Sequence, residues 1–117
     1  MQILKVVVTD FWFDQIEAGL KKHEYRKFSK YWIKRLTLDF SVELAPSFNS
    51  SFVTFGNVVY RFRFKHFDLI EFQRAYRKNP KRMTFGIKNL GSLNSGIDSD
   101  LRCIEPVFDI YLGERVK

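Results

Sequence analysis

The pattern of apolar and polar positions predicts that the chain opens with a strand followed by a helix. Residues 3–8 form a short, mostly β-branched apolar run, which is typical of a buried strand. Thr9 or Asp10 can cap the helix that follows. The apolar residues of this helix recur at helical spacing: Phe13, Ile16 and Leu20. Gly19 stands where such a helix ends, because glycine can reverse the backbone without a Cβ penalty.

A second strand, a short helix and a long uncharged stretch come next. Residues 22–26 resemble a short strand, and Ser29 can cap a helix that continues through Leu36. Residues 38–57 are nearly uncharged in their middle and include the Pro, Asn and Ser content of an exposed loop. We interpret this stretch as a strand followed by an insertion or lid.

The rest of the chain is predicted to consist mostly of strands. Residues 58–64 alternate, with four apolar side chains on one face and Val59, Arg61 and Arg63 on the other. Three further ranges are predicted strands: residues 67–76, 82–90 and 104–112. The pattern therefore predicts an α+β fold, a small closed or half-closed β-barrel of five to six mostly antiparallel strands with one or two short helices.

Composition favours a single domain over residues 1–117. The 13 Phe, 5 Tyr and 2 Trp residues supply enough bulk for one buried core. The only cysteine, Cys103, excludes an internal disulfide and a multi-cysteine metal site. No stretch approaches the roughly 18 apolar residues of a membrane span, and residues 3–8 are too short for a signal peptide. We therefore expect a soluble, cytoplasmic protein with no membrane partner.

Charge is segregated along the chain. Lys and Arg number 20 against 13 Asp and Glu, a net charge of +7. Residues 21–35 and 61–82 each carry a net charge of +6, whereas the remainder is acidic. Such segregation indicates a surface for a polyanion, although two solvated basic faces are the simpler alternative.

A motif after the first predicted helix gives the chain a family resemblance. The segment reads Gly19-Leu-Lys21-Lys-His-Glu24-Tyr-Arg26. It resembles the ASCH-domain signature G-x-K-x-x-E-x-R, and the chain looks most like the small ASCH proteins of phages and bacteria. Matching blocks follow around Tyr31-Trp32, Phe67-Asp68 and Met83–Lys88, and again at Phe108–Glu114. The resemblance covers nearly the whole chain outside residues 38–57.

This resemblance implies a PUA-like barrel with a cleft where the first helix meets the second strand. It implies binding of RNA, a nucleotide or a modified nucleoside. It also leaves open two activities of the ASCH type, a metal-independent ribonuclease and an amidohydrolase acting on an acylated cytidine. His23 has no second histidine or carboxylate at metal spacing, so we expect no metal and no cofactor.

The motif residues can be interpreted chemically. Lys21 offers a point charge suited to a phosphate or a base carbonyl, or it is an ordinary surface lysine. Glu24 beside Arg26 can accept hydrogen bonds from an exocyclic amine, or the two form a structural ion pair. In a ribonuclease, Lys21 and Glu24 would be the catalytic residues, with His23 or a tyrosine as the acid.

Aromatic and basic residues elsewhere complete the predicted nucleic-acid site. Stacking or phosphate contact is predicted for seven of them: Tyr31, Trp32, Arg35, Arg74, Tyr76, Arg77 and Lys78. For Tyr31 and Trp32 on a short helix, a place in the core is the competing interpretation.

Two alternatives to a binding module, an amidohydrolase and a protein-binding accessory protein, each depend on particular residues. The amidohydrolases of this type place a threonine nucleophile where this chain has Glu24, and a carboxylate cannot replace an activated hydroxyl in that mechanism. A phage accessory protein that binds a host protein is the other alternative. Its interface would use the aromatics of the uncharged stretch, which are Phe48, Phe52 and Phe55.

Overall fold

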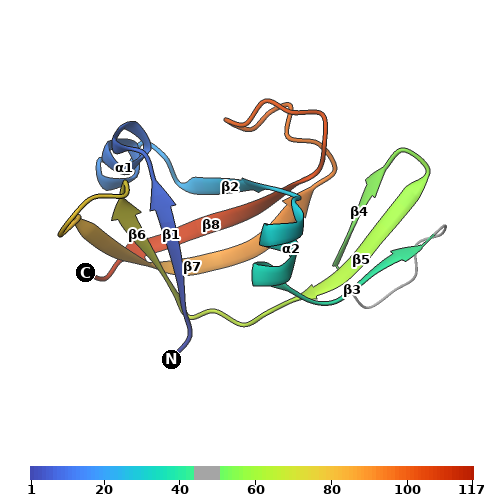
Figure 1. The fold of residues 1–117 in the computed structure, drawn as a ribbon, viewed down its shortest axis with the longest axis horizontal. Coiled ribbons are helices and arrows are strands. Elements are labelled where there is room, and N and C mark those ends of the chain that lie inside the picture. Colours follow the sequence, from blue (N-terminus) through green and yellow to red (C-terminus); the bar gives the residue numbers. More distant parts are fainter. Residues whose placement is uncertain (44–50) are drawn as a thin grey trace. The chain divides into compact units, whose positions relative to one another are not determined.

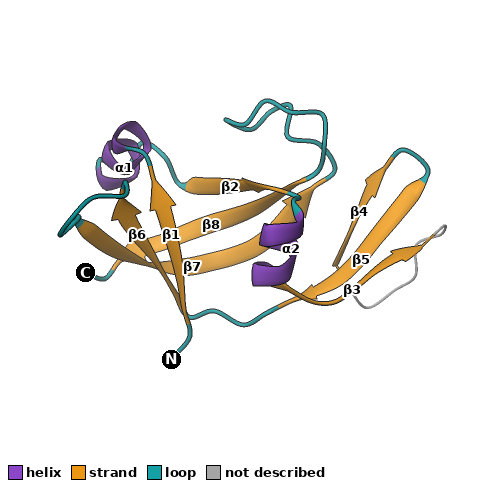
Figure 2. Ribbon diagram, in the orientation of Figure 1, coloured by secondary structure: helices purple, strands orange, loops and turns teal. Residues whose placement is uncertain are grey.

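The computed structural model describes residues 1–43 and 51–117 (Figure 1). Figure 2 shows that strands dominate and that the two helices are short. The helices are α1 (Asp10–Glu17) and α2 (Lys30–Leu36). The strands are β1 (Ile3–Val8), β2 (His23–Lys27), β3 (Thr37–Glu43), β4 (Ser51–Phe55), β5 (Val58–Phe64), β6 (Leu69–Arg74), β7 (Arg82–Leu93) and β8 (Val107–Arg115).

The strands form two sheets. The larger is a strongly curled, mixed five-stranded half-barrel in the order β1-β6-β7-β8-β2. Its β1 runs parallel to β6, and β6 runs antiparallel to β7. The smaller sheet has the order β3-β5-β4 and is antiparallel. The predicted α+β class with a half-closed barrel and two short helices is confirmed.

The chain divides into two compact units, and the first comprises residues 1–24, 66–89 and 110–117. In β1 the side chains alternate between exposed and buried, as expected for a strand with one face in a core. The buried apolar side chains of this unit come from α1 and four strands: Leu4, Val6, Val8, Phe13, Ile16, Ile70, Phe72, Met83, Phe85, Ile110 and Leu112.

The second unit comprises residues 25–65 and 90–109. Its core is aromatic, because Phe62 and Phe108 are both fully buried and their ring centroids lie 5.8 Å apart. The other buried apolar side chains of this unit are Leu36, Val53, Val59 and Val107. Ser29 caps α2 as predicted, since its hydroxyl accepts a hydrogen bond from the Trp32 N–H at 3.3 Å.

The structure corrects two predicted positions. Leu20 does not belong to the buried face of α1, because the helix ends at Glu17 and Leu20 is 74% exposed. Val59 is buried, although the alternation placed it on the polar face with Arg61 and Arg63. Val59 and Phe62 lie three residues apart on β5 and therefore point to opposite faces, yet both are buried, so neither face of this strand is wholly exposed to solvent.

The predicted insertion at residues 38–57 contributes β3 and β4 to the smaller sheet. Residues 44–50, including Phe48, lie outside the described part of the chain. Phe52 and Phe55 on β4 are both partly exposed, at 46% and 38%. Neither helix of the described residues is long and apolar enough to cross a membrane.

Candidate functional site

A cavity of about 280 Å³ lies within the first unit, at the junction between α1 and β2. Three lysines and a tyrosine give it a cationic and aromatic lining. The full set of lining residues is Ile16, Gly19, Lys21, Lys22, Phe85, Lys88, Tyr111, Leu112, Gly113 and Glu114. Residues of α1, of the turn between α1 and β2, and of β7 and β8 therefore meet at one place.

The end of α1 directs Lys21 toward the cavity. Gly19 has φ +76°, a left-handed conformation that glycine adopts without steric cost. The N–H groups of Leu20 and Lys21 donate to the Gln15 carbonyl at 3.0 and 3.2 Å, which closes the helix. The Lys22 carbonyl then accepts a hydrogen bond from the Leu112 N–H at 2.9 Å, fixing the chain against β8.

Lys21 and Glu24 form a nearly buried ion pair. Their charged atoms Nζ and Oε1 lie 3.6 Å apart, and their side chains are 9% and 6% exposed. The Lys21 ammonium also lies 4.5 Å from the centre of the Trp12 ring, a cation–π contact. The Glu24 carboxylate and the Trp12 ring therefore hold the Lys21 side chain in a fixed position where it lines the cavity.

Tyr111 supplies the aromatic surface of the cavity. Its ring stacks on His23 with centroids 4.5 Å apart and planes only 4° from parallel. The Lys88 ammonium lies 5.1 Å from the centre of the same ring. Lys22 and Lys88 are both exposed, so their charges are available to an anion entering the cavity.

A close approach of two backbones shapes one side of this cavity. A Cβ on Gly113 would lie 3.3 Å from the carbonyl carbon of Gly86, closer than most side chains tolerate. Glycine at position 113 thus lets β7 and β8 come together beside the lysines.

Four predicted site residues lie in the second unit and contact one another there. The Arg26 guanidinium lies 4.9 Å from the centre of the Trp32 ring. The Arg35 guanidinium lies 4.9 Å from the same ring and 5.6 Å from that of Tyr31. Tyr31 is 61% exposed, so the aromatics of α2 are not buried in the core. Together, Arg26 of β2 and the three residues of α2 form a cationic and aromatic surface.

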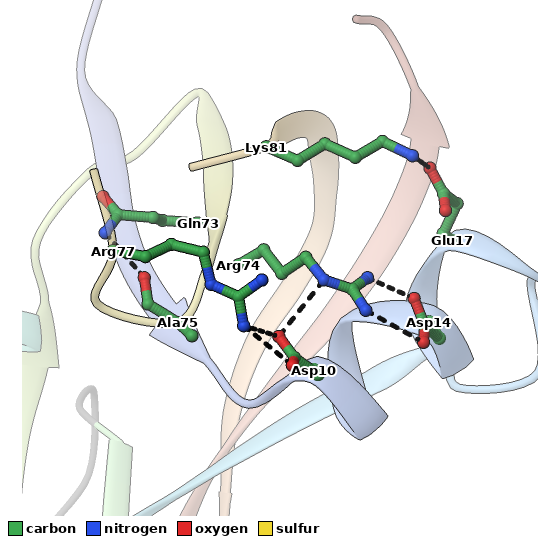
Figure 3. Close-up of polar contacts among 8 residues, drawn as sticks. All are labelled: Asp10, Asp14, Glu17, Gln73, Arg74, Ala75, Arg77 and Lys81. Carbon is green, nitrogen blue, oxygen red and sulfur yellow. Dashed lines mark hydrogen bonds and ion pairs between the residues drawn. The ribbon is translucent and has the colours of Figure 1, made fainter. Parts of the chain in front are cut away.

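The remaining predicted residues, Arg74, Tyr76, Arg77 and Lys78, lie at the end of β6 and in the turn after it, in the first unit. Figure 3 shows Arg74 and Arg77 with their acidic partners. Arg74 pairs with Asp14 and, through Nε, with Asp10 at 3.1 Å. Arg77 donates to both carboxylate oxygens of Asp10, at 2.6 and 2.8 Å. The acids of α1 thus neutralise two of the basic residues predicted to contact nucleic acid.

Tyr76 and Lys78 differ from these arginines. Tyr76 is 88% exposed, and Lys78 is also exposed. Ala75 before them and Asn79 after them have positive φ angles, so the turn has a defined, tight backbone. This part of the turn presents an aromatic ring and a cation to solvent.

Ion pairing also lowers the pKa values of two acidic residues on α1, Asp14 and Glu17. The hydrogen bond from Arg74 holds the pKa of Asp14 below its ordinary value of 3.8. The hydrogen bond from Lys81, whose Nζ lies 2.9 Å from the carboxylate, lowers the pKa of Glu17 in the same way. These two carboxyl groups therefore stay ionised near neutral pH and keep their ion pairs with Arg74 and Lys81.

Sequence reasoning missed Lys88 and Tyr111 as site residues. Both belong to blocks that carry the ASCH resemblance, which was the only available signal for them. Both residues are far from Lys21 in the sequence, and only the placement of β7 and β8 in the fold brings them to the same cavity. Within the described residues, no group of three His, Cys, Asp or Glu side chains is placed to hold a metal ion.

Comparison with known proteins adds no relative. No family model, no curated protein and no solved structure matches the chain.

Proposed function

We propose that the chain binds RNA or a nucleotide through the lysine-lined cavity of its first unit. The observation that carries this proposal is the convergence of Lys21, Lys22 and Lys88 with the Tyr111 ring in one cavity. Lysine ammonium groups suit phosphate oxygens, and an aromatic ring suits the face of a base. A cavity of about 280 Å³ suits one nucleotide unit better than a folded partner.

Each lining residue has a part in this proposal. Lys22 and Lys88 are exposed and would neutralise phosphate charge. Lys21, fixed by Glu24 and Trp12, would donate to a base carbonyl or a phosphate oxygen at a set position. Within the first unit, the exposed Tyr76 and Lys78 would give longer RNA a further stacking and phosphate contact; in the second unit, the surface of Arg26, Tyr31, Trp32 and Arg35 offers contacts of the same kind.

The family resemblance belongs to the same proposal. We propose that the half-barrel is a PUA-like domain of the ASCH type and that the protein acts in the cytoplasm. The cavity lies where the G-x-K-x-x-E-x-R motif places Gly19 and Lys21, which supports this assignment. The absence of any matching relative means that it depends on the motif and the cavity alone.

Binding is favoured over catalysis by the surroundings of Glu24. Its side chain is 6% exposed and ion-paired with Lys21, whereas a general base must reach a substrate proton. The amidohydrolase alternative lacks its threonine nucleophile at this position. A host-protein interface on β4 has weaker support, since Phe52 and Phe55 are three residues apart on a strand and point to opposite faces.

Incubation with labelled single-stranded RNA, followed by mobility-shift and denaturing gels, tests the proposal. We expect a shift with intact RNA, weakened about tenfold by Lys88→Ala, the effect of losing one charged contact of about 1.4 kcal/mol. Lys27→Ala removes the same charge from an exposed position that does not line the cavity, and it should change affinity little. Cleavage that disappears in Glu24→Ala would show a nuclease instead, and no shift at all would refute RNA binding.

A further inference from the structure

A second cavity, of about 450 Å³, lies within the second unit and has a mainly aromatic lining. Its lining residues are Phe28, Lys30, Ile33, Phe40, Phe55, Tyr60, Glu105 and Pro106. They come from the start of α2, strands β3, β4 and β5, and the segment before β8. None of them belongs to the lysine-lined cavity.

The aromatic walls are held in place by one another. The rings of Phe40 and Tyr60 stack with centroids 6.0 Å apart and planes 21° from parallel. Phe28 lies 5.8 Å from each of them and 4.8 Å from the buried Phe108. The Phe28 N–H also donates to the Pro106 carbonyl at 3.3 Å. The Phe28 plane is inclined by 51° to Phe40 and by 64° to Tyr60, so a flat ligand can stack on one wall and meet another with its edge.

Two exposed charged residues stand among these apolar walls. Lys30 is the first residue of α2, and Glu105 precedes the buried Pro106. Lysine offers hydrogen-bond donors only, and an ionised glutamate offers acceptors only. A ligand for both residues must carry an acceptor and donors, and the aromatic walls favour one that carries them on the edge of a flat ring.

We propose that this cavity binds a purine base of the guanine type. Its ring would lie among Phe28, Phe40 and Tyr60, its carbonyl oxygen would accept from Lys30, and its ring and exocyclic N–H groups would donate to Glu105. Adenine has no carbonyl group to accept a hydrogen bond from Lys30, and an alkyl chain offers neither an acceptor nor a donor to the two charged residues. The volume of about 450 Å³ accommodates a purine. This inference does not rest on the proposed function, because it concerns a different cavity.

Two-dimensional amide NMR of the whole chain, titrated with guanosine and with adenosine, tests the inference. Guanosine carries no phosphate, so its binding reports on a site for the base and not on a site that requires phosphate. We expect guanosine to shift the amide signals of Ile33, Phe55 and Glu105. We also expect its affinity to be about tenfold above that of adenosine, because adenosine leaves one charged hydrogen bond unmade. Equal affinity for the two nucleosides, or shifts confined to Lys88, Tyr111 and Gly113, would overturn it.

Matched variants locate the contacts. Phe55→Ala removes a wall of the cavity, whereas Phe52→Ala removes a similarly exposed ring of the same strand that does not line it. Glu105→Gln should abolish the preference for guanosine, and Asp98→Asn, an exposed acid outside the cavity, should keep it. All four positions are exposed, so the variants are expected to fold, and their amide spectra report this directly. Loss of guanosine binding in the two controls alone would contradict the proposed placement.

Discussion

The ammonium nitrogen of Lys21 lies 3.6 Å from a carboxylate oxygen of Glu24, and both side chains are almost removed from solvent. The pair lies at the junction between the end of α1 and the start of β2. A buried ion pair adds little net stability when intact, but removing one partner leaves an uncompensated buried charge. The pair therefore has a structural role in addition to the binding role proposed for Lys21.

Glu24→Gln should lower the free energy of unfolding by about 3 kcal/mol, because Lys21 loses its counter-charge in a buried place. Denaturant unfolding measures this change. The control is Glu114→Gln, which neutralises an exposed carboxylate at the same cavity and should cost less than about 0.5 kcal/mol. Equal stabilities of the two variants would show that the pair contributes nothing to the fold.

Lys78→Ala should weaken binding to single-stranded RNA more than Arg77→Ala does. Both residues are exposed and carry the same charge, yet Arg77 is held by both oxygens of Asp10, whereas Lys78 makes no such ion pair among the described residues. Mobility shifts at low salt compare them directly. If Arg77→Ala has the larger effect, the ion pair with Asp10 opens when RNA binds, contrary to our expectation.

The link between α1 and β6 should weaken in acid. The pKa of Asp14 is depressed in the folded chain by its hydrogen bond with Arg74, so its stabilising contribution is present above the unfolded pKa. It is lost as the pH falls below 3.8 through the folded value. Thermal melts should show a lower Tm for Asp14→Asn than for the unmodified chain at about pH 6, with the gap narrowing as the pH falls below 3.8. A gap independent of pH would mean that the carboxylate charge is not what stabilises this contact.

Local features of the fold could be predicted from the sequence. The Ser29 cap and the Gly19 turn depend on neighbouring residues and on backbone geometry, and both are present. Leu20 was assigned wrongly because its helical spacing continues past Glu17, and spacing alone cannot reveal that the chain turns first. The burial of Val59 depends on what packs over its face of β5, which the alternation of apolar and polar residues does not encode.

The candidate site was less accessible to sequence reasoning because it depends on long-range contacts. Arg74 and Asp14 are 60 positions apart, and nothing local indicates that they pair. Lys88 and Tyr111 reach the cavity only through the placement of β7 and β8. Lys21 was identified because its motif lies next to the helix end that positions it.

The salt dependence of RNA affinity tests the proposed cavity most directly. The double variant Lys22→Ala/Lys88→Ala removes two exposed charges from the cavity, and Lys5→Ala/Lys27→Ala removes two exposed charges that do not line it. For single-stranded RNA, loss of two phosphate contacts should reduce the slope of log affinity against log salt by about 1.4. We predict that reduction for the cavity variant and almost none for the control. The same slope in both variants would contradict binding at this cavity.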